Sequence, residues 1–343
     1  MARVEELLSE QLSGARGVID DITGHLSDAG GKRMRPIMTL LCAHLGKPGQ
    51  PASDNVIAAC LVVELTHLAT LYHDDVMDSA PTRRGVEAVH KVYGNNRAIL
   101  AGDVIFARAS LLCSDLGSEA TGQHARTFYR LCKGQLNETF GAEENDDPVD
   151  YYIEVLADKT GSLIAQAARF GAEYSGAPEY IADRVSEFGE DIGVAFQIAD
   201  DVLDIASDPD ISGKTPGTDL KEGVDTLPIL LLRQAKSQGS IDEDGQKILD
   251  LIDADLSKAL ATQNDVSIDS EASNAVDTGH SVVIDNTVAQ IVKMLRVHPV
   301  LEDTRNLARK WADKAKASLD DIPDSRAKTA LYEFADMLVE RMA

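Results

Sequence analysis

Helical periodicity is the feature of this sequence that most limits its possible folds. Residues 56–73 form a long stretch rich in Ala and Leu without Gly or Pro, which favours a buried helix over a strand. Residues 97–113, 124–140, 151–171 and 181–205 follow the same pattern, and apolar side chains in the last stretch recur every three or four residues. The β-branched alternation typical of strands is rare. The sequence therefore predicts an almost entirely α-helical chain.

Turn-forming residues separate these stretches, but none of the breaks has the length or composition of a domain linker. Residues 264–287 differ from the rest because they are polar, acidic and rich in turn formers. We therefore expect a single domain over residues 1–343, with an exposed acidic loop at 264–287 and a helical segment after it.

Charge and cysteine usage narrow the class of protein. The 343 residues contain 33 Lys and Arg against 57 Asp and Glu, a net charge of −24, which argues against general nucleic-acid binding. The four cysteines show no CxxC pairing and lie in apolar stretches, as small buried side chains of a reducing compartment do. We find neither a signal-peptide core nor an apolar run of about 18 residues. The expected location is the cytoplasm.

An Asp-Asp-x-x-Asp pattern closes two of the apolar helices. The two copies comprise Asp74, Asp75 and Asp78, and Asp200, Asp201 and Asp204. Because residues four apart share a helix face, the first and last aspartates of each copy project together. Their mutual repulsion and the negative end of the helix dipole both oppose this arrangement, so its repetition indicates a function. Oxygen ligands favour a hard cation such as Mg²⁺, which typically binds one or two carboxylates plus substrate phosphates.

The few basic residues gather close to these motifs in the sequence. They are Lys32, Arg33 and Arg35 before a helix, Arg83 and Arg84 after the first motif, Lys159 inside an apolar helix, and Lys214 and Lys221 after the second motif. Arg binds phosphate oxygens as a bidentate fork and Lys binds them as a point charge. Cations in more than one group beside magnesium sites indicate two substrates that each carry a diphosphate.

The order and spacing of these motifs resemble the trans-isoprenyl diphosphate synthase (polyprenyl synthetase) family from about residue 20 to residue 343. The matching segments are GKRMRP at 31–36, ELTHLATLYHDDVMD at 64–78, RRG at 83–85, DKTGSL at 158–163, FQIADDVLD at 196–204 and GKTPGTDLKEG at 213–223. The resemblance implies an all-α, single antiparallel helical domain of the isoprenoid synthase type around a deep central cavity, usually in a homodimer. It also implies head-to-tail condensation of an allylic diphosphate with isopentenyl diphosphate.

The family's functional residues carry over by position. By this resemblance, the ligands of two or three Mg²⁺ ions with bound diphosphate are Asp74, Asp78 and Asp200. The catalytic residues around them are Asp75, Asp201, Lys159, Thr160 and Gln197, with Asp204 close by. The isopentenyl diphosphate contacts resemble Lys32, Arg35, His67 and Arg84, and the allylic diphosphate contacts resemble Arg83, Lys159 and Lys214. One departure is that many members read Glu-Gly-Lys where this chain has Glu222-Gly223-Val224.

Product length in the family depends on residues just before the first motif. In members that make short products, a Phe or Tyr four or five positions before the first Asp closes the cavity floor. Those positions hold Thr70 and Ala69 here, so we expect geranylgeranyl or longer, with hexaprenyl to decaprenyl favoured as for quinone side chains. Phe106 or Tyr129 could close the cavity deeper down, which leaves a geranylgeranyl diphosphate synthase as the alternative.

Three other classes of protein compete with this interpretation. A terpene cyclase binds one diphosphate and has no use for the GKRMRP segment and His67. A non-catalytic subunit of a heteromeric synthase usually has degraded aspartate motifs, whereas both are intact here. An acidic helical scaffold leaves the cations beside the aspartates unexplained. We expect isoprenoid diphosphates as small-molecule partners, a homodimer, no nucleic acid, and a product that partitions to the membrane.

Overall fold

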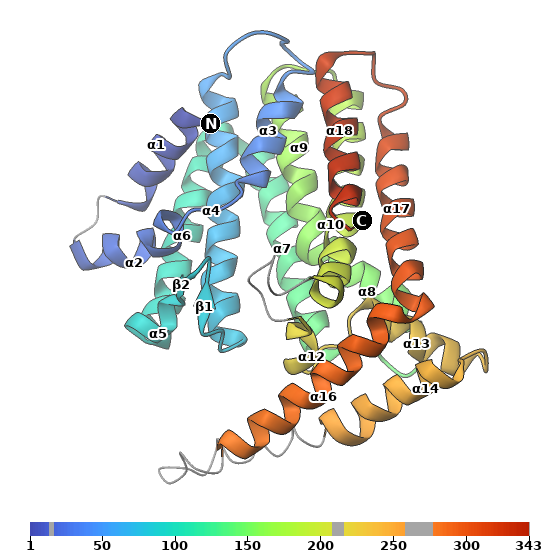
Figure 1. Ribbon diagram of the computed structural model, residues 1–343. Coiled ribbons are helices and arrows are strands. Elements are labelled where there is room, and N and C mark those ends of the chain that lie inside the picture. The colour runs from blue at the N-terminus through green and yellow to red at the C-terminus, as the bar shows by residue number, and fades with distance from the viewer. Residues whose placement is uncertain (14–16, 208–215, 258–276, 343) are drawn as a thin grey trace. The chain divides into compact units, whose positions relative to one another are not determined.

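The computed structural model describes residues 1–13, 17–207, 216–257 and 277–342, and within these ranges the chain is almost entirely helical (Figure 1). The strands in these ranges are β1 (Thr82–Arg83) and β2 (Val86–Glu87), which form one short antiparallel ladder. The all-α prediction is confirmed.

Contacts within the chain divide it into two compact units. Unit 1 comprises Met1–Leu136, Ala157–Gly193 and Lys314–Phe334, and unit 2 comprises Asn137–Leu156, Val194–Asp313 and Ala335–Ala343. The sequence predicted one domain without linkers, and the unit boundary at Leu136 lies inside a helix rather than in a linker.

Unit 1 carries the first aspartate motif. Its elements are α1 (Ala2–Leu12), α2 (Gly17–Asp28), α3 (Met34–Ala43), α4 (Asp54–Met77), β1, β2, α5 (Val89–Tyr93), α6 (Asn95–Leu116), most of α7 (Ser118–Phe140), the π-helix η1 (Ala157–Gly161), α9 (Ser162–Tyr174), the first half of α10 (Glu179–Ala206), the end of α17 (Pro299–Ser318) and the first part of α18 (Arg326–Glu340). Helix α4 starts where the Ser53 Oγ accepts a hydrogen bond from the Val56 N–H, a standard N-cap. It packs against α3, α6 and α9, so most of its surface is covered.

Helix α4 also has the length and apolar composition of a membrane-crossing segment, and no other helix in the described ranges has both. The sequence had predicted no such segment. However, 72% of its most apolar window is buried inside the protein, and Leu65, Leu68 and Tyr72 are fully buried. The core helix of a compact protein has the same composition, and α4 is the core helix of unit 1.

Three glycines bring α10 close to the segment that precedes and begins α9. A Cβ added to Gly193 would lie 2.6 Å from the Cα of Gly161, and one added to Gly189 would lie 2.7 Å from the Cα of Ala165. Side chains at these positions would push the helices apart. The glycines therefore fix the place of η1, which carries Lys159 and Thr160, against the first half of α10.

Unit 2 carries the second aspartate motif. Its elements are the end of α7, α8 (Pro148–Leu156), the second half of α10, α12 (Thr218–Lys221), α13 (Leu227–Ser237), α14 (Glu243–Asp250), the π-helix η2 (Leu251–Leu256), α16 (Asp277–Val297), most of α17 (Pro299–Ser318) and the end of α18 (Arg326–Glu340). Its core includes the fully buried Ile248, Val288 and Leu295. Much of the acidic loop predicted at 264–287 lies outside the described residues, and from Asp277 onward that segment is the start of α16 rather than a loop.

Candidate active site

The first aspartate motif ends α4, and its three carboxylates have different surroundings. Asp75 is fully buried, and its Oδ1 accepts a hydrogen bond of 2.6 Å from the Arg83 Nε, while its Oδ2 is buried without a hydrogen-bond partner among the described residues. Burial raises the pKa of Asp75, although the Arg83 guanidinium opposes the shift. Asp74 is half-buried and Asp78 is exposed. Asp75 therefore turns into the protein, away from the accessible face that Asp74 and Asp78 share.

Of the two arginines that follow this motif, Arg83 ends β1 and Arg84 begins the two-residue hairpin turn. Arg84 and Gly85 both have positive φ angles, 54° and 80°, as a type I′ turn between β1 and β2 requires. Arg83 ion-pairs with Asp75, whereas the Arg84 Nη1 donates hydrogen bonds to the carbonyls of Leu26, at 2.7 Å, and Gly30. The turn thus directs two adjacent arginines to different partners.

The loop before α3 is shaped around Arg84. Gly31 has a φ of 150°, and a Cβ added there would lie 2.9 Å from the Arg84 Cζ. Two residues later, Arg33 is buried and ion-paired at 3.0 Å with both Glu5 and Glu64. Arg33 is therefore a structural cation, which leaves Lys32 on the loop and Arg35 in the first turn of α3 as the cations available to a ligand.

His67 lies two turns before Asp74 on α4, within a group of positive charges. Burial lowers the pKa of His67 well below its ordinary value, and Arg35, Arg84, Arg83 and Arg33 lower it further. Burial also lowers the pKa of Arg35 to about 10, and the Arg35 Nε is buried without a hydrogen-bond partner among the described residues. The structure thus brings Arg35, His67 and Arg84 together, with Lys32 exposed on the loop before α3. A partly buried group of cations of this kind is suited to an anion.

The second aspartate motif is in unit 2, and its middle residue is again buried. Asp201 is 5% exposed, and its Oδ2 accepts hydrogen bonds from the Tyr152 Oη at 2.9 Å and from the Leu227 N–H at 3.3 Å. Burial and the nearby Asp219 raise the pKa of Asp201 well above its ordinary value. Tyr152 was not singled out from the sequence, because a tyrosine on a helix carries no signal of this contact.

Asp200 and Asp204 lie on the more accessible face of α10. The Arg341 guanidinium, just past the end of α18, pairs with Asp200 at 3.0 Å and lies over the Phe196 ring. The Asp204 Oδ1 accepts a hydrogen bond of 3.1 Å from the Thr218 N–H. The sequence did not indicate Arg341, because it is far from the motif along the chain.

The end of α10 is held by a cation from α16. Arg296 donates hydrogen bonds to the carbonyls of Ile205, at 2.8 Å, and Ser207, at 2.6 Å. These carbonyls belong to the last helical turn, whose acceptors have no partner within the helix. Arg296 therefore stabilises the helix end that carries Asp204.

Asp219, which follows the second motif in the sequence, extends this acidic group. Burial, followed by the charges of Asp204, Glu222, Asp200 and Glu138, raises the pKa of Asp219 to about 7. Burial is the largest cause of this raised pKa, and the neighbouring carboxylates add a negative charge that a divalent cation would offset. The sequence signal was present, since Asp219 lies inside the GKTPGTDLKEG segment, but nothing distinguished it from a surface aspartate.

The donor set fits a magnesium ion that substrate completes. Within residues 1–13, 17–207, 216–257 and 277–342, no three His, Cys, Asp or Glu side chains are already arranged as a metal site. Mg²⁺ does not need such a cage, because it usually keeps waters and binds one or two carboxylates plus phosphate oxygens. The accessible carboxylates that would hold such ions are Asp74 and Asp78 in unit 1 and, separately, Asp200 in unit 2, with Asp204 on the same face of α10.

Lys159 and Thr160 lie on the π-helix η1, where neighbouring residues of unit 1 fix the backbone. The buried Asp158 accepts a hydrogen bond of 2.6 Å from the Arg130 Nε and pairs with Lys133 at 3.4 Å. A Cβ added to Gly134 would lie 2.8 Å from the Lys159 backbone nitrogen, so α7 touches this turn directly. π-Helical turns occur frequently at functional sites.

Lys214, one of the predicted allylic diphosphate contacts, lies outside the described residues. The structure does describe Lys221 and Gln197. Lys221, next to the departure at Val224, ion-pairs with Asp285 at 2.6 Å, so its ammonium group is already engaged. Gln197 is half-buried on α10, one turn before Asp201.

The two residues predicted to set product length have different environments. Ala69 is 2% exposed and belongs to an apolar cluster that α4 forms with α6, whereas Thr70 is half-buried. Phe106 stacks on Phe128 with ring centroids 3.8 Å apart, and Tyr129 is largely exposed. Thr70 is therefore the more accessible of the two positions.

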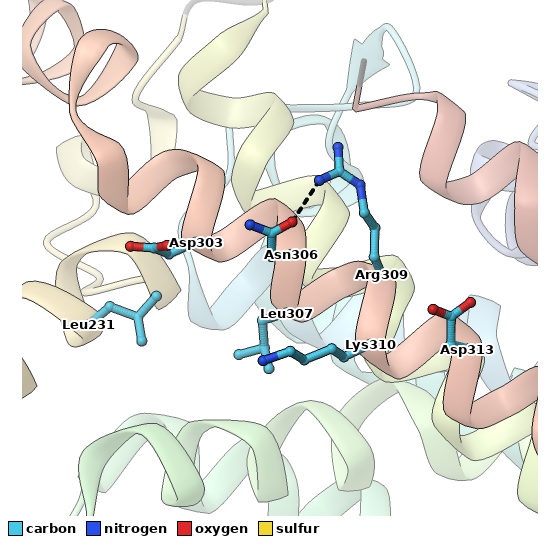
Figure 2. Close-up of a pocket in the computed structure, with 7 residues that line it drawn as sticks. All are labelled: Leu231, Asp303, Asn306, Leu307, Arg309, Lys310 and Asp313. Carbon is cyan, nitrogen blue, oxygen red and sulfur yellow. Dashed lines mark hydrogen bonds between the residues drawn. The ribbon is translucent and has the colours of Figure 1, made fainter.

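A pocket of about 550 Å³ lies elsewhere in unit 2, along α17 (Figure 2). In it the Arg309 Nη1 donates a hydrogen bond of 2.8 Å to the Asn306 Oδ1. The pocket is lined by Leu231, Asp303, Asn306, Leu307, Arg309, Lys310 and Asp313, none of which is a predicted site residue.

Known proteins resemble this chain over most or all of its length. A model of the polyprenyl synthetase family matches residues 16–261. The nonaprenyl diphosphate synthase of Mycobacterium tuberculosis is 40% identical over 341 residues, covering 99% of this chain and 92% of that protein. The polyprenyl synthase from Caulobacter crescentus CB15, complexed with calcium and isoprenyl diphosphate, has a TM-score of 0.80 and 30% identity, over 100% of this chain and 95% of the other.

A second solved structure is as similar. The geranylgeranyl pyrophosphate synthase from Corynebacterium glutamicum, also complexed with calcium and isoprenyl diphosphate, has a TM-score of 0.78 and 37% identity, over 100% of this chain and 95% of the other. The helical fold and the two aspartate-rich helix ends define an all-α prenyltransferase with the isoprenoid synthase fold. The chain belongs to the polyprenyl synthetase family.

Proposed function

We propose that this chain catalyses the Mg²⁺-dependent, head-to-tail condensation of isopentenyl diphosphate with an allylic diphosphate. The observation that carries the proposal is the group formed by Arg35, His67 and Arg84. In it a buried Arg35 donor has no hydrogen-bond partner among the described residues, and burial together with the neighbouring arginine charges depresses the His67 pKa. A diphosphate supplies both the missing acceptor and the missing negative charge. The calcium and isoprenyl diphosphate in the two related structures support a divalent cation and a diphosphate ligand.

In this proposal, each of the two substrates is bound by its own set of cationic residues. Lys32, Arg35, His67 and Arg84 bind isopentenyl diphosphate, while Arg83, Lys159 and Lys214 bind the allylic diphosphate. Asp74, Asp78 and Asp200 hold two or three Mg²⁺ ions, which when bound neutralise the charge that develops on the leaving diphosphate.

The remaining chemistry needs no dedicated carboxylate base. The allylic C–O bond breaks, the isopentenyl double bond forms the new C–C bond, and the proton then lost passes to the departed diphosphate. Thr160 and Gln197 line the reacting centre, and apolar helices such as α4 keep water from the carbocation. Asp75 and Asp201, which the family resemblance groups with the catalytic residues, are instead turned into the protein.

The test is incubation with isopentenyl diphosphate and each allylic primer, followed by chromatography of the products. Lys32→Ala and Arg35→Gln should raise the KM for isopentenyl diphosphate, whereas Lys159→Ala should raise the KM for the allylic primer. A charge-assisted hydrogen bond is worth about 1.5–3 kcal/mol, so each effect should be roughly tenfold to a hundredfold. The division of the cations is wrong if Lys32→Ala impairs only the allylic primer.

We further propose a long-chain product, in the hexaprenyl to decaprenyl range. The absence of an aromatic side chain at Ala69 and Thr70 and the 40% identity to a nonaprenyl diphosphate synthase support this range. The 37% identity to a geranylgeranyl pyrophosphate synthase favours the alternative of a shorter product. Because Ala69 is packed in the core and Thr70 is accessible, Thr70→Tyr is the better variant for shortening the product with condensation retained. A wild-type enzyme that stops at farnesyl diphosphate would contradict the proposed range.

The quaternary structure we propose is a homodimer formed through α6 and α7. Leu100, Val104 and Leu111 form an exposed apolar stripe along α6, and Tyr129 and Leu136 are exposed apolar side chains on α7. Exposed apolar stripes of this kind mark protein interfaces, and a second copy of the chain is the partner proposed. Light scattering coupled to size exclusion should give a dimer for the wild type and a monomer for the Leu100→Glu, Leu111→Glu double variant.

The location we propose is the cytoplasm. The four cysteines are free thiols, and Cys42, Cys60 and Cys113 are buried, as suits a reducing compartment. Fractionation of cells that produce the protein tests this location.

A further inference from the structure

We propose that Tyr152 is a positioning residue for the second aspartate motif, and that it acts through Asp201, which serves as an anchor rather than as a metal ligand. The inference rests on the proposed function and extends it, because it assigns different roles to three aspartates that look equivalent in the sequence. It concerns residues of unit 2 only.

Two donors from different elements meet at one oxygen of Asp201. The Tyr152 hydroxyl, from α8, donates at 2.9 Å, and the Leu227 N–H, the first of α13, donates at 3.3 Å, both to Oδ2. The positive end of the α13 dipole adds to the attraction for this carboxylate. Asp201 is 5% exposed, and its Oδ2 is already bound by two donors within the protein, so a metal ion would have to displace them to bind this oxygen.

Because of helix geometry, anchoring Asp201 also orients the proposed metal ligands on the same helix. An α-helix turns about 100° per residue, so Asp200 and Asp204 share a face from which Asp201 points away. Fixing the Asp201 carboxylate between α8 and α13 therefore fixes the rotation of α10 about its own axis. That rotation sets the direction in which Asp200 and Asp204 present their oxygens.

The first aspartate motif independently shows the same arrangement, with one buried, anchored aspartate and two accessible ones. Asp75, its middle residue, is fully buried and bound at 2.6 Å by Arg83, while Asp74 and Asp78 are accessible. A different donor, from a different kind of element, performs the same task there. An anchored middle aspartate is thus a feature of both motifs and not an accident of one.

The first experiment compares two adjacent tyrosines. Tyr152→Phe removes the donor to Asp201, whereas Tyr151→Phe removes a hydroxyl that donates at 2.9 Å to the Asn137 carbonyl. The readout is the affinity for Mn²⁺ in the presence of inorganic pyrophosphate, measured by electron paramagnetic resonance without turnover. Removing a residue that orients a metal ligand typically costs about 10- to 100-fold in affinity, which we expect for Tyr152→Phe and not for Tyr151→Phe. Equal affinities for the two variants would overturn the role of Tyr152.

The second experiment separates an anchor from a ligand. Asp201→Asn keeps an oxygen that accepts from both Tyr152 and Leu227, whereas Asp201→Ala removes it. We expect Asp201→Asn to retain most of the Mn²⁺ affinity and Asp201→Ala to lose as much as Tyr152→Phe, with helix content unchanged by circular dichroism. Equal losses for Asn and Ala would identify Asp201 as a ligand and overturn the inference.

Failure of this inference is distinguishable from failure of the proposed function. If the wild type condenses isoprenoid diphosphates and Tyr152→Phe binds Mn²⁺ as the wild type does, the positioning role alone is wrong. If the wild type forms no condensation product but the four variants follow the expected order of affinity, the proposed function is wrong and the positioning role stands. A wild type that binds no Mn²⁺ with pyrophosphate would overturn both.

Discussion

The three cations at the start of α3, Lys32, Arg33 and Arg35, have different roles although they lie within four residues of one another. Arg33 is buried, has a φ of 49° and pairs with Glu5 and Glu64, whereas Lys32 is exposed and Arg35 is half-buried. The sequence grouped them as one basic cluster, because the partners of Arg33 come from distant helices. Burial and pairing, which no local pattern reveals, decide which cation is structural.

A prediction about stability follows from the Arg33 pairing. Arg33→Met leaves the carboxylate of Glu64, which is 1% exposed, without its ion-pair partner. Breaking a buried pair in this way costs about 3–5 kcal/mol, so the free energy of unfolding in urea should fall by that amount. Lys32→Met is the matched control and should stay within about 0.5 kcal/mol of the wild type. A loss below about 1 kcal/mol for Arg33→Met would show that the pair contributes little.

His67 should make stability depend on pH. Its pKa in the folded protein is well below the value of about 6.5 expected for the unfolded chain, so the unfolded chain binds more protons below about pH 6.5. The free energy of unfolding should therefore decrease as the pH falls through that value. Urea unfolding at about pH 7.5 and pH 5.5 should show a smaller decrease for His67→Gln than for the wild type, while the exposed His44→Gln should match the wild type. An unchanged decrease in His67→Gln would contradict the depressed pKa.

Helices were the elements that the sequence predicted well. The long apolar stretches became α4, α6, α7 and α10, because helical periodicity of apolar side chains acts locally. The stretch 151–171 was predicted as one helix but is interrupted by the π-helix η1. This turn depends on Arg130, Gly134 and Asp158, which meet only in the folded chain. Tertiary contacts of this kind leave no periodic signal.

Gly134 provides a test of the π-helix. Gly134→Ala places a Cβ 2.8 Å from the Lys159 backbone nitrogen, so η1 has to shift. Because a misplacement of about 1 Å can cost a hundredfold in rate, kcat/KM for the allylic diphosphate should fall about 10- to 100-fold. Gly122→Ala, on the same helix, meets only the flexible end of Arg126 at 3.4 Å and should leave the rate unchanged. Similar rates for both variants would show that the position of η1 does not control the reaction.

The candidate site was predicted in its residues but not in their division of labour. The duplicated motif identified all six aspartates, yet consecutive aspartates look alike in a sequence, and only the structure shows Asp75 and Asp201 turned inward. Asp219, Tyr152 and Arg341 were missed because each depends on a contact between elements distant in the chain. The motif spacing thus predicts where the chemistry lies, and packing decides which oxygen is available for it.

At the scale of the whole molecule, part of the net charge of −24 lies in groups of acidic side chains, and bound cations would reduce the repulsion within these groups. Thermal unfolding should therefore respond more to Mg²⁺ and pyrophosphate together than to the sum of their separate effects, because carboxylates and phosphates complete each other's coordination. At about 100 times its dissociation constant, a ligand that binds only the native state stabilises it by about 2.7 kcal/mol. Chelation should reverse the gain, and an additive response to the two ligands would count against a shared site.

The two-residue turn at Arg84 and Gly85 has a consequence for sequence change in this region. A type I′ turn holds two residues, so one residue inserted or deleted between Thr82 and Glu87 would replace the turn and shift the register of β1 against β2. Arg83 would leave Asp75, and Arg84 would leave the carbonyls of Leu26 and Gly30. A replacement of either side chain alters one partner, but a change of length alters both at once. In an alignment with related chains, this segment should therefore vary in residue type long before it varies in length.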